Sequence, residues 1–308
     1  MYRIEEEKLK KIIESVPNFS EGIREEIIKK IVDPIREISD VKVLNLSSDK
    51  DHNRSVLTLA GDEDGLKKAV DILFAGAIEH IDLTKHKGEH PRMGAVDVLP
   101  FIPIRGITME ECVAFSREIG EHIASTFHIP VYLYEKSATV PERENLANIR
   151  KGQFEGFFEK IRSPEWKPDY GPAEVHKTAG AVAVGSREFL VAYNINLATD
   201  NLEIASKIAK SIRHSSGGLR FVKAMGVMLE ERRIAQVSMN LTDFRKTPIF
   251  RVFEMVKNEA ARYGVNVIGS EIVGLIPNDA LLDVAEYYLR IENFKYSTVL
   301  ENRLAEVE

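Results

Sequence analysis

Strand-like and helix-like segments alternate along most of the chain, and this order limits the possible folds more than any other feature. Short runs of apolar and β-branched residues predict strands at 41–46, 54–60, 96–102, 131–134, 181–184, 189–195, 234–240 and 265–269. Amphipathic segments between them predict helices at 22–37, 63–81, 108–127, 202–214, 249–263 and 278–289. Such an order is typical of β-sheets with helices packed against them.

Several of the predicted strands alternate polar with apolar side chains, as the run from Arg54 to Leu59 does. This pattern favours mixed or antiparallel sheets over a doubly wound parallel sheet. Residues 162–180 contain three prolines and two glycines with little periodicity, so we expect an irregular crossing between two halves of the chain. A length of 308 residues fits one large domain or two domains of about 150 residues each.

The composition narrows the class of protein. A net charge of -6 argues against general binding of nucleic acid or of anionic membranes. The sequence contains no signal peptide and no long apolar span, so we expect a cytoplasmic protein. Cys112 is the single cysteine, which excludes an internal disulfide, and its helical surroundings predict a buried helix residue and not a nucleophile.

The segment HKGEHPRMGAVDVLPFIPIRG, residues 86–106, concentrates chemistry ahead of a buried strand. Its glycines and Pro91 disfavour a regular helix, so the first part is expected to be a bent loop. His86 and His90 are four residues apart, but without a helix or a third ligand this spacing does not predict a metal site. One alternative is a pair of histidines hydrogen-bonded within the loop. The other is a general acid or base whose charge state Arg92 and Asp97 could set.

Three further segments are polar. Residues 45–55, NLSSDKDHNRS, fit a solvated turn between two strands. In residues 16–22, VPNFSEG, Ser20 fits the N-cap of a helix. Amides alternate along two predicted strands of the second half and should line one face, as a polar inner surface or a subunit interface. These are Asn194, Asn196, Gln236 and Asn240, together with Ser238.

Taken together, these segments resemble the formiminotransferase family, which includes the N-terminal part of formiminotransferase-cyclodeaminases. The matching stretches are VPNFSEG, DHNRSV, HKGEHPRMGAVDVLPFIPIRG, HIPVYLYEK, DYGP, FLVAYNINL, AQVSMNLTDF and GSEIVGLIP. They occur in the family's order from about residue 13 to 290, and the longest spans 21 residues of mixed chemistry. A match of this length is far more specific than a short motif.

The resemblance implies an α+β or α/β fold of two subdomains, residues 1–187 and 188–308. Each is expected to be a mixed or antiparallel sheet with helices on its outer face, with folate in a cleft between them. The implied reaction moves a formimidoyl group between N-formimidoyl-L-glutamate and N5 of tetrahydrofolate, in histidine degradation. Tetrahydrofolate is then a co-substrate, and no metal is expected. Family members form homodimers or larger assemblies. A chain ending at 308 would rely on a separate cyclodeaminase.

By position, the catalytic histidine of the family falls on His90. The family's assisting acidic residue falls on Ser47, so Asp49 or Asp51 is expected to replace it. Asp49 is favoured because Asp51 adjoins His52 and is expected to be occupied there. Arg92 and Arg105 suit the carboxylates of glutamate and folate because a guanidinium pairs with carboxylate in a bidentate manner. The folate segment falls on 171–180. The other predicted binding residues are Gly171, Pro172, Lys177, Thr178, Gly180, Asn53, Asn194 and Asn196.

Three other functions stay open on the sequence. Formyl transfer from 5-formyltetrahydrofolate would use the same site with a closely related donor. A folate-binding protein without turnover would keep the fold alone. A metal-dependent hydrolase would use His86 and His90 as ligands.

Overall fold

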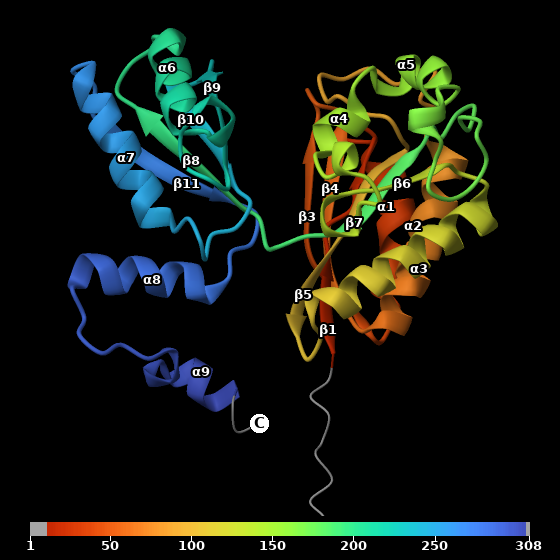
Figure 1. Cartoon of the computed structure of the whole chain (residues 1–308), viewed down its shortest axis with the longest axis horizontal. Coiled ribbons are helices and arrows are strands. Elements are labelled where there is room, and N and C mark those ends of the chain that lie inside the picture. The colour runs from red at the N-terminus through yellow and green to blue at the C-terminus, as the bar shows by residue number, and fades with distance from the viewer. Residues whose placement is uncertain (1–10, 306–308) are drawn as a thin grey trace, which may run out of the picture. The chain divides into compact units, whose positions relative to one another are not determined.

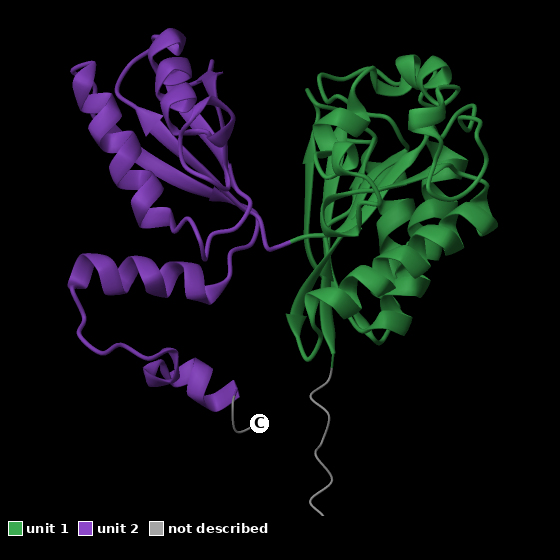
Figure 2. Ribbon diagram, in the orientation of Figure 1, with its two compact units in different colours: residues 1–187 green, residues 188–308 purple. Residues whose placement is uncertain are grey.

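The computed structural model describes residues 11–305. The chain forms two compact units, the first ending at Arg187 and the second beginning at Glu188 (Figure 2). Each unit has its own apolar core and its own β-sheet. The expected organisation of two α/β units is therefore confirmed.

The first unit contains a mixed sheet, as predicted. β1 and β2 lie between β4 and β5 and pair with both, β3 pairs with the outer side of β4, and β7 and β6 follow β5. The pairs β5–β7 and β6–β7 are parallel and the remaining pairs are antiparallel. The strands are β1 (Ile12–Ser15), β2 (Asn18–Phe19), β3 (Val41–Asp49), β4 (Arg54–Gly61), β5 (Val96–Arg105), β6 (Val131–Leu133) and β7 (Val182–Ser186).

Three long helices pack against this sheet: α1 (Glu25–Arg36), α2 (Glu63–His80) and α3 (Met109–Phe127) (Figure 1). The side chain of Asp62 caps α2, and Thr108 with Glu111 forms a capping box at the start of α3. Cys112 is buried in α3, as its helical surroundings predicted. Two short helices follow, α4 (Leu146–Arg150) and α5 (Gln153–Lys160). The 3-10 turns of the chain are Glu135–Ser137, Pro141–Arg143, Pro164–Trp166, His214–Ser216 and Tyr296–Thr298.

Two expectations about local structure are wrong. Ser20 does not cap a helix: α1 begins later, at Glu25, and the Ser20 hydroxyl donates to the carbonyl of Gly94. Residues 162–180 do not join the two units, because β7 follows them within the first sheet. This segment is held by bridges from Tyr170 to Val131 and from Gly180 to Gly94. In both places, contacts distant in sequence decide a conformation that the local pattern misassigned.

The second unit is a four-stranded antiparallel sheet in the order β11-β8-β10-β9. α6 and α7 pack on the sheet, and α8 packs on α7 (Figure 1). The strands are β8 (Val191–Leu197), β9 (Val222–Leu229), β10 (Ile234–Leu241) and β11 (Val267–Val273). The helices are α6 (Leu202–Ile212), α7 (Ile249–Arg262), α8 (Asn278–Leu289) and α9 (Leu300–Ala305). None of the helices described is long and apolar enough to cross a membrane.

A buried carboxyl in the first sheet should make stability depend on pH. Glu14 on β1 is 5% exposed, and burial raises its pKa from 4.5 to about 7 against the opposing attraction of Arg187. The folded state therefore binds more protons than the unfolded state between these pH values, and stability falls as pH rises through them. We expect Glu14→Gln to raise the free energy of unfolding by about 1–3 kcal/mol at pH 8, with little change near pH 4.

Urea unfolding at both pH values measures this effect, and Glu37→Gln on the exposed side of the first unit serves as the control. Equal free energies of unfolding for the Glu14 variant and the wild type at pH 8 would show that the ionised carboxyl does not destabilise the folded state.

Candidate active site

Loops distant in sequence converge around His90. Ser20 donates to the carbonyl of Gly94 over 2.8 Å, and Nε2 of His86 donates to the carbonyl of Asn53 over 2.9 Å. Gly94 also forms a bridge with Gly180. The polar segments singled out in the sequence of the first unit therefore meet at the start of β5.

The imidazole of His90 is buried, with 6% of the residue exposed. Its Nε2 lies 3.4 Å from Oδ2 of Asp97. Because a carboxylate only accepts hydrogen bonds, this contact assigns the proton of the neutral ring to Nε2. Nδ1 makes no hydrogen bond with any described residue, so its lone pair is left to accept a proton from a ligand.

Asp97 is fully buried on β5 and is satisfied on both oxygens. Oδ1 accepts from the amide of Met93 over 2.7 Å, and Oδ2 accepts from the guanidinium of Arg150 as well as from His90. Burial alone would raise the pKa of Asp97, but the attraction of Arg150 and these hydrogen bonds outweigh it and hold the pKa below its usual value. Asp97 therefore remains a carboxylate beside the imidazole.

The surroundings of His90 favour the neutral ring. Burial lowers the pKa of His90, Asp97 opposes this, and the positive charges of Arg150 and Arg54 lower it further, with a net lowering. An imidazole that is neutral near pH 7 and has a free Nδ1 is suited to act as a general base.

The favoured candidate for the assisting carboxylate, Asp49, contacts His52. Asp49 accepts from the amide of His52 over 2.9 Å, and its other oxygen lies 3.1 Å from Nδ1 of His52. The sequence interpretation had instead expected Asp51 to be occupied by His52. The carboxylate in contact with His90 is Asp97. The sequence analysis named Asp97, together with Arg92, as a group that could set the charge state of a histidine in this segment.

Of the two predicted arginines, Arg92 is paired within the protein and Arg105 is exposed. Arg92, 7% exposed, already holds a carboxylate: its two terminal nitrogens donate to Glu155 over 2.9 and 2.7 Å. Its Nε donates to His86 over 3.3 Å. Arg105 is exposed at the far end of β5, about 26 Å from Asp97 at the ordinary rise of a strand. The arginines near His90 are Arg150 and Arg54, neither of which the sequence singled out.

The predicted folate segment lies partly against the histidine loop. Ala181 donates to the carbonyl of Met93 over 3.0 Å, and Ala95 donates to that of Ala179 over 2.8 Å. Gly180 is buried at this contact, whereas Thr178 is half-buried. Gly171, Pro172 and Lys177 are exposed. The segment thus offers solvent-facing groups close in sequence to a backbone that contacts the loop of His90.

Gly180 is required by the backbone itself. Its φ of +74° is rarely adopted by other residues, and a Cβ there would lie 2.1 Å from the carbonyl oxygen of Met93. We expect Gly180→Ala to lower the free energy of unfolding by more than about 3 kcal/mol, because the clash adds to a backbone cost of about 1–3 kcal/mol.

Gly152 provides the matched control, since its φ is +94° but a Cβ would meet nothing closer than 3.4 Å. Gly152→Ala should show the backbone cost alone in thermal or urea unfolding. Equal losses in the two variants would contradict the close approach at Gly180.

Asn53, a predicted binding residue, has its side chain committed to the protein. Its Oδ1 accepts from the amide of Gly22 over 2.9 Å, and its Nδ2 donates to the carbonyl of Lys87 over 2.9 Å. These bonds tie together three of the loops around His90. The structure therefore gives Asn53 a role in positioning the loops.

The amides of the second unit share one face of its sheet, as predicted, and surround a carboxylate that the sequence analysis missed. Nε2 of Gln236 donates to Oδ1 of Asn196 over 2.9 Å and to Glu271 over 2.8 Å. Nδ2 of Asn194 donates to the same carboxylate over 3.1 Å. Glu271 on β11 could have been noticed only by pairing β11 with β8.

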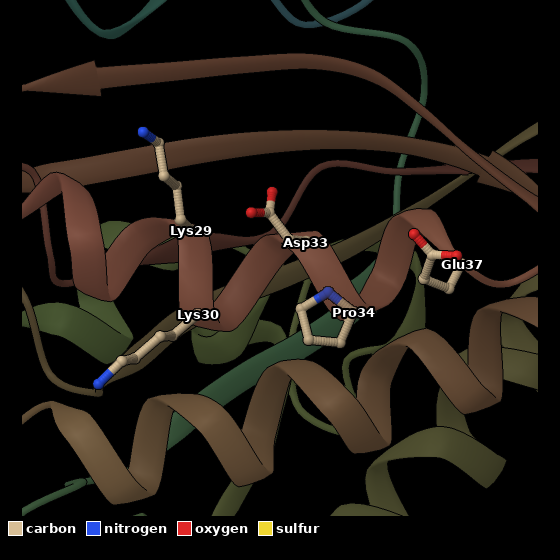
Figure 3. Close-up of a pocket in the computed structure, with 5 residues that line it drawn as sticks. All are labelled: Lys29, Lys30, Asp33, Pro34 and Glu37. Atoms are coloured by element: carbon tan, nitrogen blue, oxygen red, sulfur yellow. The ribbon is translucent and has the colours of Figure 1, made fainter.

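A surface pocket along α1 is lined by Lys29, Lys30, Asp33, Pro34 and Glu37 (Figure 3). Four of these residues lie in α1 and Glu37 is its C-cap, and none is a predicted site residue. Among residues 11–305, no group of three or more His, Cys, Asp or Glu side chains is arranged to hold a metal ion. His86 and His90 instead contact Asn53 and Asp97.

Known protein families and relatives match nearly the whole chain. The family model for the N-terminal subdomain of the formiminotransferase domain matches residues 12–187, and that for the formiminotransferase domain matches 192–306. A glutamate formimidoyltransferase of Streptococcus pyogenes is 56% identical, covering 96% of this chain and 99% of that protein. One from Thermoplasma acidophilum is 48% identical, covering 95% and 97%.

A formimidoyltransferase-cyclodeaminase of Dictyostelium discoideum is 42% identical, covering 96% of this chain and 56% of that protein. Among solved structures, an unknown protein from Galdieria sulphuraria aligns over 86% of this chain and 99% of that one, with a TM-score of 0.28 and 8% identity. That similarity is too low to support a structural argument.

Proposed function

The chain belongs to the formiminotransferase family, and from this membership we propose that it transfers a formimidoyl group between N-formimidoyl-L-glutamate and N5 of tetrahydrofolate. The observation that carries the proposal is the buried imidazole of His90, with Nε2 against Asp97 and Nδ1 free. Tetrahydrofolate is the co-substrate, and the residues of the site supply the proton transfers.

The chemistry requires one group that first accepts a proton and then returns it. N5 of tetrahydrofolate attacks the amidine carbon, and Nδ1 of His90 accepts the proton that the attacking nitrogen loses. A tetrahedral intermediate forms, and the imidazolium then protonates the glutamate nitrogen as it leaves. Such acid–base catalysis contributes about 10²–10⁴-fold in rate. Holding the two substrates in line contributes further.

Asp97 positions the imidazole and stabilises its protonated form. Its hydrogen bond to Nε2 fixes the ring and leaves Nδ1 for the substrate. Its negative charge balances the imidazolium that forms between the two proton transfers. Arg150 keeps Asp97 ionised, so it acts through the carboxylate and not on the substrate proton.

The segment 171–180 is proposed to bind folate. Its contact with the loop of His90 would bring a bound pterin near Nδ1. The exposed Lys177 is suited to the carboxylates of the folate tail. The predicted homodimer, separate cyclodeaminase partner and cytoplasmic location stay predictions.

Initial rates with two donors test the function. N-formimidoyl-L-glutamate with tetrahydrofolate is compared with 5-formyltetrahydrofolate with glutamate, at equal protein concentration. We expect the formimidoyl reaction to be faster. Faster formyl transfer would assign the alternative donor, and folate binding without either reaction would indicate a binding protein. Hydrolysis that is lost on chelation would indicate a metal-dependent enzyme.

A further inference from the structure

Arg54, the first residue of β4, is a cation without a partner beside His90. Its side chain is partly buried, and its Nε is enclosed without a hydrogen-bond acceptor. The side chain makes no hydrogen bond or ion pair with any residue that the structure describes. A guanidinium in such a position is costly unless a ligand pairs with it.

The charges around the imidazole are unbalanced toward the positive. Two guanidinium groups, Arg54 and Arg150, act on the charge of His90, and among the described residues the carboxylate that opposes them there is the buried Asp97. Oδ2 of Asp97 already accepts from both Arg150 and His90. Arg150 also has an enclosed Nε without an acceptor. With a neutral imidazole, this partly buried group of side chains carries an excess positive charge and unused N–H donors.

Neighbouring side chains do not remove this excess. Burial lowers the pKa of Arg54, and repulsion from Arg150 lowers it further, despite the attraction of Asp49 and Asp97. Asp49 pairs with Arg54 in the strand register, but its carboxylate lies against His52. The site is therefore prepared for an anion from outside.

We propose that Arg54, with Arg150, binds the α-carboxylate of the amino-acid substrate and so sets its specificity. This inference rests on the proposed function. In N-formimidoyl-L-glutamate a single carbon joins the α-carboxylate to the nitrogen that carries the formimidoyl group. A carboxylate held by Arg54 thus places that nitrogen beside the imidazole of His90. The planar guanidinium matches a carboxylate with two parallel hydrogen bonds.

The assignment also accounts for the second carboxylate of glutamate. The side-chain carboxylate is two bonds further from the reacting nitrogen and has to be held elsewhere. Arg54 therefore discriminates between ligands by the carboxylate nearest the reaction, and a ligand that has only the distal carboxylate should bind independently of it.

The test measures binding of three ligands by titration calorimetry. They are N-formimidoyl-L-glutamate, N-formimidoyl-4-aminobutyrate, which lacks the α-carboxylate, and N-formimidoyl-2-aminobutyrate, which lacks the side-chain carboxylate. The wild type should bind the glutamate compound about 10–100-fold more tightly than the 4-aminobutyrate compound, the range expected for hydrogen bonds between charged groups.

Arg54→Gln should lose this preference. Its affinity for N-formimidoyl-L-glutamate should fall at least about tenfold, with its affinity for the 4-aminobutyrate compound unchanged. Arg36→Gln removes the same charge from the exposed part of α1, where Arg36 lies 3.6 Å from Asp33, and should change nothing. Arg54→Lys keeps the charge without the planar fork and should show an intermediate preference.

The outcomes separate this inference from the proposed function. Equal binding of the first two ligands by the wild type, or a preference that survives in Arg54→Gln, would overturn the assignment even if formimidoyl transfer proceeds. Arg54→Gln could instead lose only the preference for N-formimidoyl-L-glutamate over N-formimidoyl-2-aminobutyrate. That result would show that Arg54 binds the side-chain carboxylate, and it would also overturn the assignment. A preference that depends on Arg54, without any transfer to tetrahydrofolate, would support the carboxylate site and reject the transferase function. If a variant fails to fold, the wild type alone still tests the inference, because equal binding of the first two ligands would overturn it.

Discussion

Replacing His90 by alanine is expected to lower turnover at least about a hundredfold while both substrates still bind. A general base acts mainly in the transition state, so its loss affects kcat more than affinity. The side chain is buried with one hydrogen-bond partner among the described residues, Asp97. The measurement is steady-state kinetics with N-formimidoyl-L-glutamate and tetrahydrofolate, with Kd for each substrate measured separately.

His86→Ala is the matched control, because it removes an imidazole from the same loop. His86 is bound to the carbonyl of Asn53 and accepts from Arg92, so its role is to hold the loop. Its loss should reduce stability and turnover modestly. Near-normal turnover of the His90 variant, or equal losses in both variants, would contradict the assignment of His90 as the base.

Asp97→Asn is expected to lower turnover at least about tenfold and to move the acidic limb of the pH–rate profile to lower pH. The carboxylate favours the protonated form of His90, so its removal lowers the pKa of the imidazole. An amide at this position can also donate to Nε2 and so favour the wrong tautomer. Asp97→Ala would leave Arg150 without its buried partner and should lower the free energy of unfolding by about 3–5 kcal/mol.

The pH dependence of kcat/KM distinguishes this role from a purely structural one, since a loss of folded protein would lower the whole profile without moving its limb. Asp49→Asn is the control, because Asp49 pairs with His52 and should leave the profile unchanged. A shifted acidic limb in Asp49→Asn, with a normal profile in Asp97→Asn, would assign the assisting role to Asp49 and not to Asp97.

The long helices were predictable because their apolar stripes repeat over several turns. The predicted helix 278–289 coincides with α8, and 63–81 ends one residue beyond α2. β1 and β2 were missed because each is short and Pro17 interrupts them. β9 was missed too, as Gly226 breaks a run whose apolar residues do not alternate clearly.

The site was predictable where its parts are neighbours in sequence. His90 and Asp97 are seven residues apart, in one segment that already indicated chemistry. Arg150 is 53 residues beyond Asp97, on a short helix with no clear periodic pattern, so only the fold could bring it to the carboxylate. Asp49 was favoured over Asp51 because Asp51 adjoins His52 in the chain, but the carboxylate that contacts His52 is that of Asp49.

Transfer of a labelled carbon tests the central claim most directly. N-formimidoyl-L-glutamate carrying carbon-13 in the formimidoyl group is incubated with the protein and tetrahydrofolate, and the products are identified by mass spectrometry. We expect the label to appear on tetrahydrofolate as glutamate is released, and this transfer to be lost in the His90→Ala variant. Label that remains on glutamate, or that appears in free formamide or formate while tetrahydrofolate stays unlabelled, would contradict formimidoyl transfer at this site.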